Sequence, residues 1–96
     1  MTSKLEWPFS ETENTAVITT SRVVKQESPV LCVVHDENGE WQFLDGNDIK
    51  IEDAVVVSLG SIIKHDNSLV SVAGLKSGCQ AWRENIGYSW KQSKLT

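Results

Sequence analysis

The chain has 96 residues, four tryptophans, two cysteines and a formal net charge of −4. This length is typical of one domain with a single hydrophobic core, and the acidic balance argues against nucleic acid as a partner. The longest apolar runs, such as 30–34, are far shorter than the roughly 20 residues of a membrane-spanning helix, so no membrane partner is expected.

The cysteines and the start of the chain bear on the compartment. Secreted domains of this size usually carry more than two cysteines, and no apolar segment that could serve as a signal peptide follows Met1. Cys32 lies within a Val-rich run. We therefore expect a cytoplasmic protein in which Cys32 and Cys79 are buried free thiols.

The first quarter of the chain predicts an arm, a strand and a short helix. Residues 1–14 are polar apart from a Trp-Pro-Phe segment, which indicates a loose arm pinned by Trp7 and Phe9. Residues 15–20 are β-branched almost throughout and predict a strand. Ser21 is a suitable N-cap for one or two helical turns that follow this strand.

A hairpin is the strongest local signal in the sequence. Residues 30–35 are apolar at nearly every position, which predicts a central strand. The Asn38-Gly39 pair tolerates the positive φ angles of a type I′ turn and leads into a Trp/Phe strand at 41–44. The sequence therefore predicts a two-residue hairpin loop.

That loop length fixes an expected register. It would place Val34 opposite Phe43 and Glu37 opposite Glu40, with Trp41 and Phe43 directed to the core. Like charges directly opposite each other are mildly destabilising. The Glu37/Glu40 pair at the tip therefore hints that the tip is acidic for a reason other than stability.

The second half of the chain predicts two strands separated by two short helices. Residues 54–58 read as a strand, and a helical period follows with Ser58 as its N-cap. Asp66 or Asn67 would cap a second short helix. Residues 79–84 alternate well enough to form a closing strand.

Together these elements predict the α+β class. We expect a single small antiparallel sheet of four to five strands, with two or three short helices packed on one face. The expected boundaries are a loose arm at 1–14, one domain at 15–92 and a frayed tail at 93–96.

Charge is distributed unevenly along the chain. Residues 36–53 hold seven carboxylates against the single Lys50, whereas the rest of the chain after residue 14 is net positive. Complementary charge steers protein association, so a basic protein is a natural partner for this region. The alternative is an acidic loop that is merely solvated. The residues expected to bind a partner are Glu37, Glu40, Asp45, Asp48 and Asp53.

The sequence carries few of the arrangements that catalysis or metal binding requires. The serines lie in no nucleophile elbow, and no glycine-rich phosphate loop is present. An EF-hand loop counted from Asp45 would need a ligand at Ile49 and glycine at Lys50, and it fails at both positions. We therefore expect no metal, no cofactor and no enzyme activity.

Two alternatives to a partner-binding surface remain open. A lone arginine on a strand can bind a carboxylate or phosphate, so Arg83 with His65 and Cys79 could line a ligand pocket. An ion pair is the plainer interpretation of Arg83. The chain could also form a structural homodimer through an edge strand.

Several short segments together carry a resemblance to known proteins. They are Ile18 to Val24, Pro29-Val30, the Gly39-x-Trp-x-Phe-Leu-x-Gly46 run, Asp66 to Leu69 and Gly78 to Arg83. This pattern resembles small bacterial proteins similar to a domain-of-unknown-function family often assigned to the immunity proteins of polymorphic toxin systems. The resemblance spans residues 18 to 90. It implies a cytoplasmic bacterial protein that neutralises a toxin by binding it, and it transfers no site residue.

Overall fold

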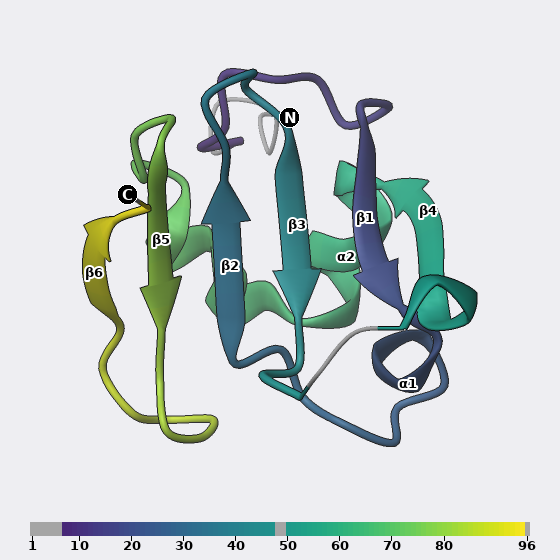
Figure 1. The fold of residues 1–96 in the computed structure, drawn as a ribbon. Helices are drawn as coiled ribbons and strands as arrows, with labels where there is room; N and C mark the ends of the chain where they lie inside the picture. Colours follow the sequence, from purple (N-terminus) through teal and green to yellow (C-terminus); the bar gives the residue numbers. More distant parts are fainter. Residues whose placement is uncertain (1–6, 48–49, 96) are drawn as a thin grey trace.

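The computed structural model describes residues 7–47 and 50–95, which form one six-stranded sheet with short helical segments (Figure 1). The strands are β1 (Ala16–Thr20), β2 (Cys32–His35), β3 (Trp41–Leu44), β4 (Ala54–Ser58), β5 (Cys79–Trp82) and β6 (Lys91–Lys94). The helices are α1 (Ser21–Val24) and α2 (Leu59–His65), and the 3-10 helices are η2 (Ile51–Asp53) and η3 (Asn67–Val72).

The strand order is β4-β1-β3-β2-β5-β6, and β1 and β3 run parallel. The α+β class and the single sheet are confirmed, whereas the expected four to five strands, all antiparallel, are wrong. The parallel pair arises because β2, the strand that follows β1 in the chain, does not lie next to β1 in the sheet. The position between them is taken by β3. The β2–β3 hairpin then brings β3 back between β2 and β1, in the direction of β1.

The sixth strand was the least visible in the sequence. β6 reads Lys-Gln-Ser-Lys, and all four of its residues are exposed. It pairs with β5 in the antiparallel sense, with Gln80 opposite Ser93 and Cys79 opposite Lys94. The prediction of a frayed tail from residue 93 therefore differs from the structure, because backbone pairing alone holds a strand that has no apolar alternation.

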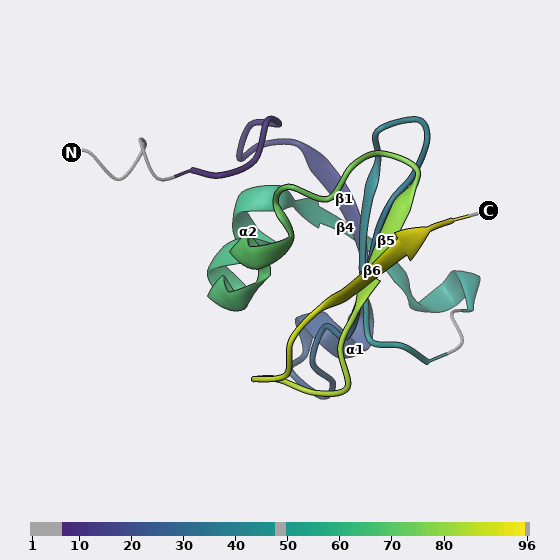
Figure 2. The same cartoon turned by 90° about the vertical axis from the view of Figure 1, so that its left-hand side faces the viewer.

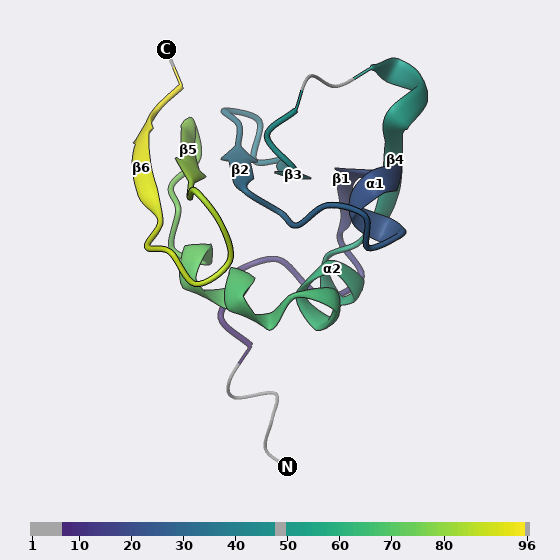
Figure 3. The same cartoon turned by 90° about the horizontal axis from the view of Figure 1, so that it is seen from below.

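The helical layer covers one face of the sheet (Figure 2). α2 and η3 lie together on that face, whereas η2 and the connection into β4 lie on the opposite side, as the view from below shows (Figure 3). The core between the sheet and the helical layer contains fourteen buried apolar residues. They are Phe9, Val17, Val23, Val30, Val33, Trp41, Phe43, Leu59, Ile62, Ile63, Leu69, Val72, Leu75 and Ala81.

Trp41 is the centre of an aromatic cluster in this core. Its ring stacks on Phe43 with centroids 5.9 Å apart and on His35 at 3.9 Å, and Phe9 meets it edge-on at 5.2 Å. The Trp41 Nε1 donates to no acceptor among the described residues, so the ring stabilises the fold by packing. The expected core position of Trp41 and Phe43 is confirmed.

The arm is held in the way that its aromatic residues suggest. Phe9 is buried against Trp41, and Trp7 packs on Phe9 with ring centroids 5.5 Å apart. The Trp7 Nε1 donates to the carbonyl oxygen of Glu11 at 2.7 Å. From Trp7 onward the arm is therefore part of the packed domain, and the first six residues lie outside the described structure.

The β2–β3 hairpin has a different register from the expected one. The structure pairs Val33 with Phe43 and His35 with Trp41. The backbone N–H of Asp36 donates to the carbonyl oxygen of Glu40 at 2.9 Å, which closes a three-residue loop with Gly39 at φ 86°. A type I turn followed by a left-handed glycine is the usual geometry of such loops. Asn38-Gly39 satisfies it as readily as it would a two-residue turn, so the predicted loop was one residue too short.

Two of the expected helix N-caps are confirmed, and the third lies one residue earlier than expected. Ser58 Oγ accepts from Ser61 N, and Asp66 Oδ1 accepts from Ser68 N, as expected. At α1 the cap is Thr20, whose Oγ1 accepts from Val23 N at 3.3 Å, and Ser21 is the first helical residue. The last residue of β1 therefore also starts the helix.

The glycine at the hairpin tip gives a test of this turn. A Cβ at Gly39 would meet no atom within 4 Å, so Gly39→Ala would be opposed only by the positive φ angle. We expect it to lower the free energy of unfolding by about 1 kcal/mol, measured by urea titration.

Gly74→Ala is the matched control for this change. A Cβ at Gly74 also meets nothing within 4 Å, and the backbone there is outside the left-handed region. Its unfolding free energy should equal or slightly exceed that of the wild type. Equal stability of both variants would contradict the three-residue loop with a left-handed Gly39.

Candidate functional site

The helical layer of α2 and η3 leaves the opposite face of the sheet uncovered (Figures 2 and 3), and we call it the open face. The register aligns a row of side chains across it, with Ile18 opposite both Val56 and Gln42, and Val34 opposite both Gln42 and Gln80. A second row joins Leu44, Cys32 and Trp82. The open face therefore comprises Ile18, Cys32, Val34, Gln42, Leu44, Val56, Gln80 and Trp82.

This surface is apolar in character and shaped by two shallow hollows. Trp82 is 37% exposed and Val56 is 69% exposed. One hollow of about 540 Å³ is lined in part by Cys32, Gln80 and Trp82. A second, of about 220 Å³, lies between β1, β3 and β4, and Glu40 lines it together with Ile18 and Val56.

Two of the expected acidic contact residues lie at the hairpin tip and are available for contact. Glu37 and Glu40 are both exposed. The carboxylate of the preceding Asp36 is used within the loop, because its Oδ1 accepts from the backbone N–H groups of Asn38 and Glu40, each at 2.9 Å. Glu40 thus connects the acidic tip to the open face.

Asp45 is a correction to the predicted contact residues. It is 4% exposed, and its Oδ2 accepts from Arg22 Nε at 2.6 Å while Oδ1 accepts from Arg22 Nη2 at 3.3 Å. The Arg22 guanidinium holds the pKa of the Asp45 carboxyl below its usual range, chiefly through the hydrogen bond between them. A buried, ion-paired carboxylate cannot contact a partner surface, so Asp45 is structural.

Asp53 shares the same guanidinium. Its Oδ2 lies 3.0 Å from Arg22 Nη1, and the side chain is 24% exposed. Asp53 therefore contributes less free charge than its place in the acidic run suggests. Asp48 lies outside the described residues. The neighbouring Glu52 in η2 was not predicted as a contact residue, yet it is exposed.

Arg83 is a structural residue, which agrees with the ion-pair interpretation. Its side chain is 2% exposed, and Nη2 lies 3.0 Å from Asp66 Oδ2. The guanidinium also donates to the carbonyl oxygen of Val30 through Nε and Nη2, at 3.2 and 3.0 Å, and to Ser68 Oγ at 3.0 Å. It lies 4.4 Å from the centroid of the Trp90 ring. These contacts join β5 to the start of η3 and occupy the donors of Arg83.

The three residues of the alternative pocket are not brought together. Arg83 and Cys79 lie four residues apart on an extended segment, a separation of about 13 Å. The hollows that Arg83 lines contain neither Cys79 nor His65. Cys79 is half-buried and packs against the hydrophobic core. The predicted pocket of Arg83, His65 and Cys79 is therefore wrong.

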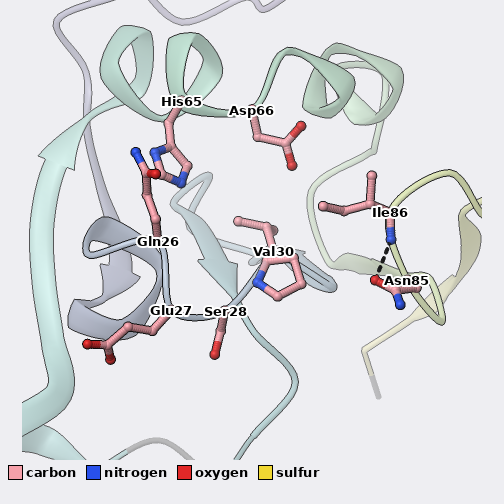
Figure 4. Close-up of a pocket in the computed structure, with 9 residues that line it drawn as sticks. Gln26, Glu27, Ser28, Val30, His65, Asp66, Asn85 and Ile86 are labelled. Carbon is pink, nitrogen blue, oxygen red and sulfur yellow. Dashed lines mark hydrogen bonds between the residues drawn. The ribbon is translucent and has the colours of Figure 1, made fainter.

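His65 instead lines a hollow of about 550 Å³ between α2 and the loops below it (Figure 4). His65 and Gln26 lie side by side on one side of this hollow, and Asn85 and Ile86 lie on its opposite side. The left-handed backbone of Gln26, at φ 64°, has a local cause. Its N–H donates to Val23 O, and the next N–H, of Glu27, donates to Arg22 O. This Schellman-type pattern ends α1 and needs no ligand to explain it.

Other chemistry was sought among the described residues. Within 7–47 and 50–95, no group of three or more His, Cys, Asp or Glu side chains could hold a metal ion. Burial raises the pKa of the Cys32 thiol, which disfavours the thiolate that a nucleophile would need. In the same ranges, no helix is both long and apolar enough to cross a membrane.

Sequence reasoning missed most of the open face. Val56 lies in a strand that is apolar at four of its five positions, which is typical of a strand buried on both sides. It is exposed because β4 is an edge strand. For Trp82, the sequence offered one signal of an outward position, namely that it alternates with Ala81 along the predicted strand. No family model, curated protein or solved structure matches the chain.

The Arg22–Asp45 contact predicts a pH-dependent stability. Because the folded-state pKa of Asp45 lies below the unfolded value of about 3.9, its stabilisation is present above pH ~4 and is lost as pH falls through the folded pKa. Asp45→Asn should lower the unfolding free energy at pH 7 by about 1–3 kcal/mol, a deficit that shrinks below pH ~3. Denaturant titration at each pH measures it.

Glu52→Gln is the matched control for Asp45→Asn, because Glu52 is an exposed carboxylate of the same segment. It should leave both stability and its pH dependence unchanged. A deficit for Asp45→Asn that stayed constant down to pH ~2 would show that the carboxylate charge is not what matters.

Arg83→Lys tests the second ion-paired arginine. A lysine cannot reproduce the forked donation to Val30 O, Ser68 and Asp66, so we expect a loss of about 1–3 kcal/mol in thermal or urea unfolding. Lys64→Arg, on the exposed side of α2, should change stability little. If both substitutions proved neutral, the Arg83 contacts would contribute nothing to folding.

Proposed function

We propose that the chain is a non-catalytic binding module that covers a basic protein surface with its open face, as an immunity-type inhibitor of a toxin would. The observation that carries the proposal is an uncovered sheet face of aliphatic and amide side chains bordered by exposed carboxylates. Glu40 lines the hollow of about 220 Å³ between β1, β3 and β4. The 3-10 helix η2, which contains Glu52, lies on the same side of the sheet (Figure 3).

The two parts of this surface have different physical roles. Exposed carboxylates at Glu37, Glu40 and Glu52 attract a cationic surface from a distance and raise the association rate. The apolar centre slows dissociation, because aromatic and aliphatic side chains that lose water on contact contribute most of the binding energy. Trp82, 37% exposed, is the aromatic residue best placed to serve as an anchor.

The charge of the protein favours a cationic partner over a neutral one. The formal net charge is −4, and Arg22 neutralises the carboxylates of Asp45 and Asp53. Among the described residues of the 36–53 region, the carboxylates that remain exposed are therefore those at the hairpin tip and in η2. A cytoplasmic bacterial setting and a toxin as the partner belong to the same proposal and rest on the resemblance of residues 18–90 to immunity-type proteins.

The experiment uses the whole chain as immobilised bait for host proteins. A captured basic protein is identified, purified and titrated by calorimetry at about 50 mM and about 300 mM salt, and we expect weaker binding at the higher concentration. Gln42→Arg places a cation at the centre of the open face. It should weaken binding by about 100-fold, because a buried charge facing a basic surface has no partner.

Glu27→Arg is a stricter control, because it raises the net charge by two, against one for Gln42→Arg, at a position in the connection after α1 beside the hollow of His65. It should change the dissociation constant by less than about twofold, apart from a small uniform loss from net charge. Coexpression of the wild-type chain should also relieve growth arrest caused by the partner. Equal binding by wild type and Gln42→Arg would refute the open face as the contact.

A further inference from the structure

We propose that the outer edge of β4 pairs with β4 of a second copy of this chain, so that two six-stranded sheets join across a two-fold axis. This contact uses the backbone edge of the sheet, and it shares Val56 with the face proposed to bind a basic protein. It stands on the contrast between the two edge strands and on the self-complementarity of β4.

The two edges of the sheet differ in how they are protected. β6 carries Lys91 and Lys94 at its ends, and lysine on an edge strand is a common protection against pairing with another sheet. β4, with the sequence Ala-Val-Val-Val-Ser, contains no charge, proline or glycine. It pairs with β1 on its inner side, and no described strand lies on its outer side.

The strand is also complementary to itself. An antiparallel pair centred on Val56 would place Val56 opposite the partner's Val56, and Val55 opposite the partner's Val57. Ala54 would then face the partner's Ser58. β-branched residues directly opposite each other stabilise antiparallel pairs. Because the same residues meet in both directions, the contact closes as a dimer, and the only edges left among the described strands are the two lysine-bearing β6 strands.

Both sides of β4 have apolar surface that such a pair would cover. On the open face, Val56 is 69% exposed in the single chain. On the helical side, a hollow of about 170 Å³ is lined by Val57 and by residues of α1 and α2, namely Val24, Ser61, Ile62 and His65. The pairing places the partner's Val55 next to Val57, at this hollow. Val24, itself 47% exposed, would gain cover there.

The expected dimer is weak, because two five-residue strands bury less than the roughly 1,600 Å² of a standard stable interface. The test is therefore sedimentation velocity of the whole chain from about 5 µM to about 1 mM, with a dimer forming as concentration rises. Amide exchange within residues 54–58 should slow over the same range. A sedimentation coefficient that stays monomeric at the highest concentration would overturn the proposal.

Val56→Lys is the informative variant. Its side chain is exposed, so the domain should fold, and circular dichroism checks this independently of assembly. Two lysines facing each other at the centre of the pair should raise the dimer dissociation constant at least about tenfold. Gln92→Lys adds the same charge to β6, at the other edge, and should leave dimerisation unchanged.

Trp82→Glu separates this contact from the open face. Trp82 lies in β5, which is separated from β4 by the three strands β1, β3 and β2. The substitution should reduce capture of a basic partner and leave the β4 dimer intact. If Trp82→Glu abolishes self-association while Val56→Lys does not, the copies meet through their open faces, and the edge proposal is wrong.

Discussion

One guanidinium group determines how the lower end of the domain is built. Arg22, in the helix that follows β1, binds Asp45 at the end of β3 and Asp53 just before β4. This is feasible because β1 lies between β3 and β4, so the helix after β1 reaches the ends of both neighbours. The contact fixes where the 45–53 segment leaves and rejoins the sheet. In the structure η2 lies on the open side (Figure 3).

The same contact changes the meaning of the acidic run. A count of carboxylates along the chain describes surface charge only where those carboxylates are solvated and unpaired. Here Asp45 and Asp53 bind Arg22, and Asp36 binds backbone N–H groups of its own loop. Within the described part of this run, the exposed carboxylates are thus those at the hairpin tip and in η2. These two places lie at different ends of β3 and together border the apolar face.

Local features were predictable and long-range ones were not. Patterns within a few residues were enough to predict the strands between residues 15 and 58 and the N-caps at Ser58 and Asp66. They also predicted the core positions of Trp41 and Phe43. The hairpin register could not be predicted in this way, because Asn38-Gly39 suits loops of two and of three residues. The Arg22–Asp53 pair could not be predicted either, because its members are 31 residues apart. The open face depends on strand order, and β6 has no apolar pattern at all.

The register of β2 against β5 also settles how the two cysteines relate. Cys32 is opposite Trp82 and belongs to the open face, whereas Cys79 is opposite His35 and packs against the core. Both are free, and a disulfide needs side chains that converge, which opposite faces of one sheet forbid. Cys32 and Cys79 therefore cannot form a disulfide with each other in this fold. The fold also carries one thiol on the surface proposed to meet a partner, where a chemical label would report on contact.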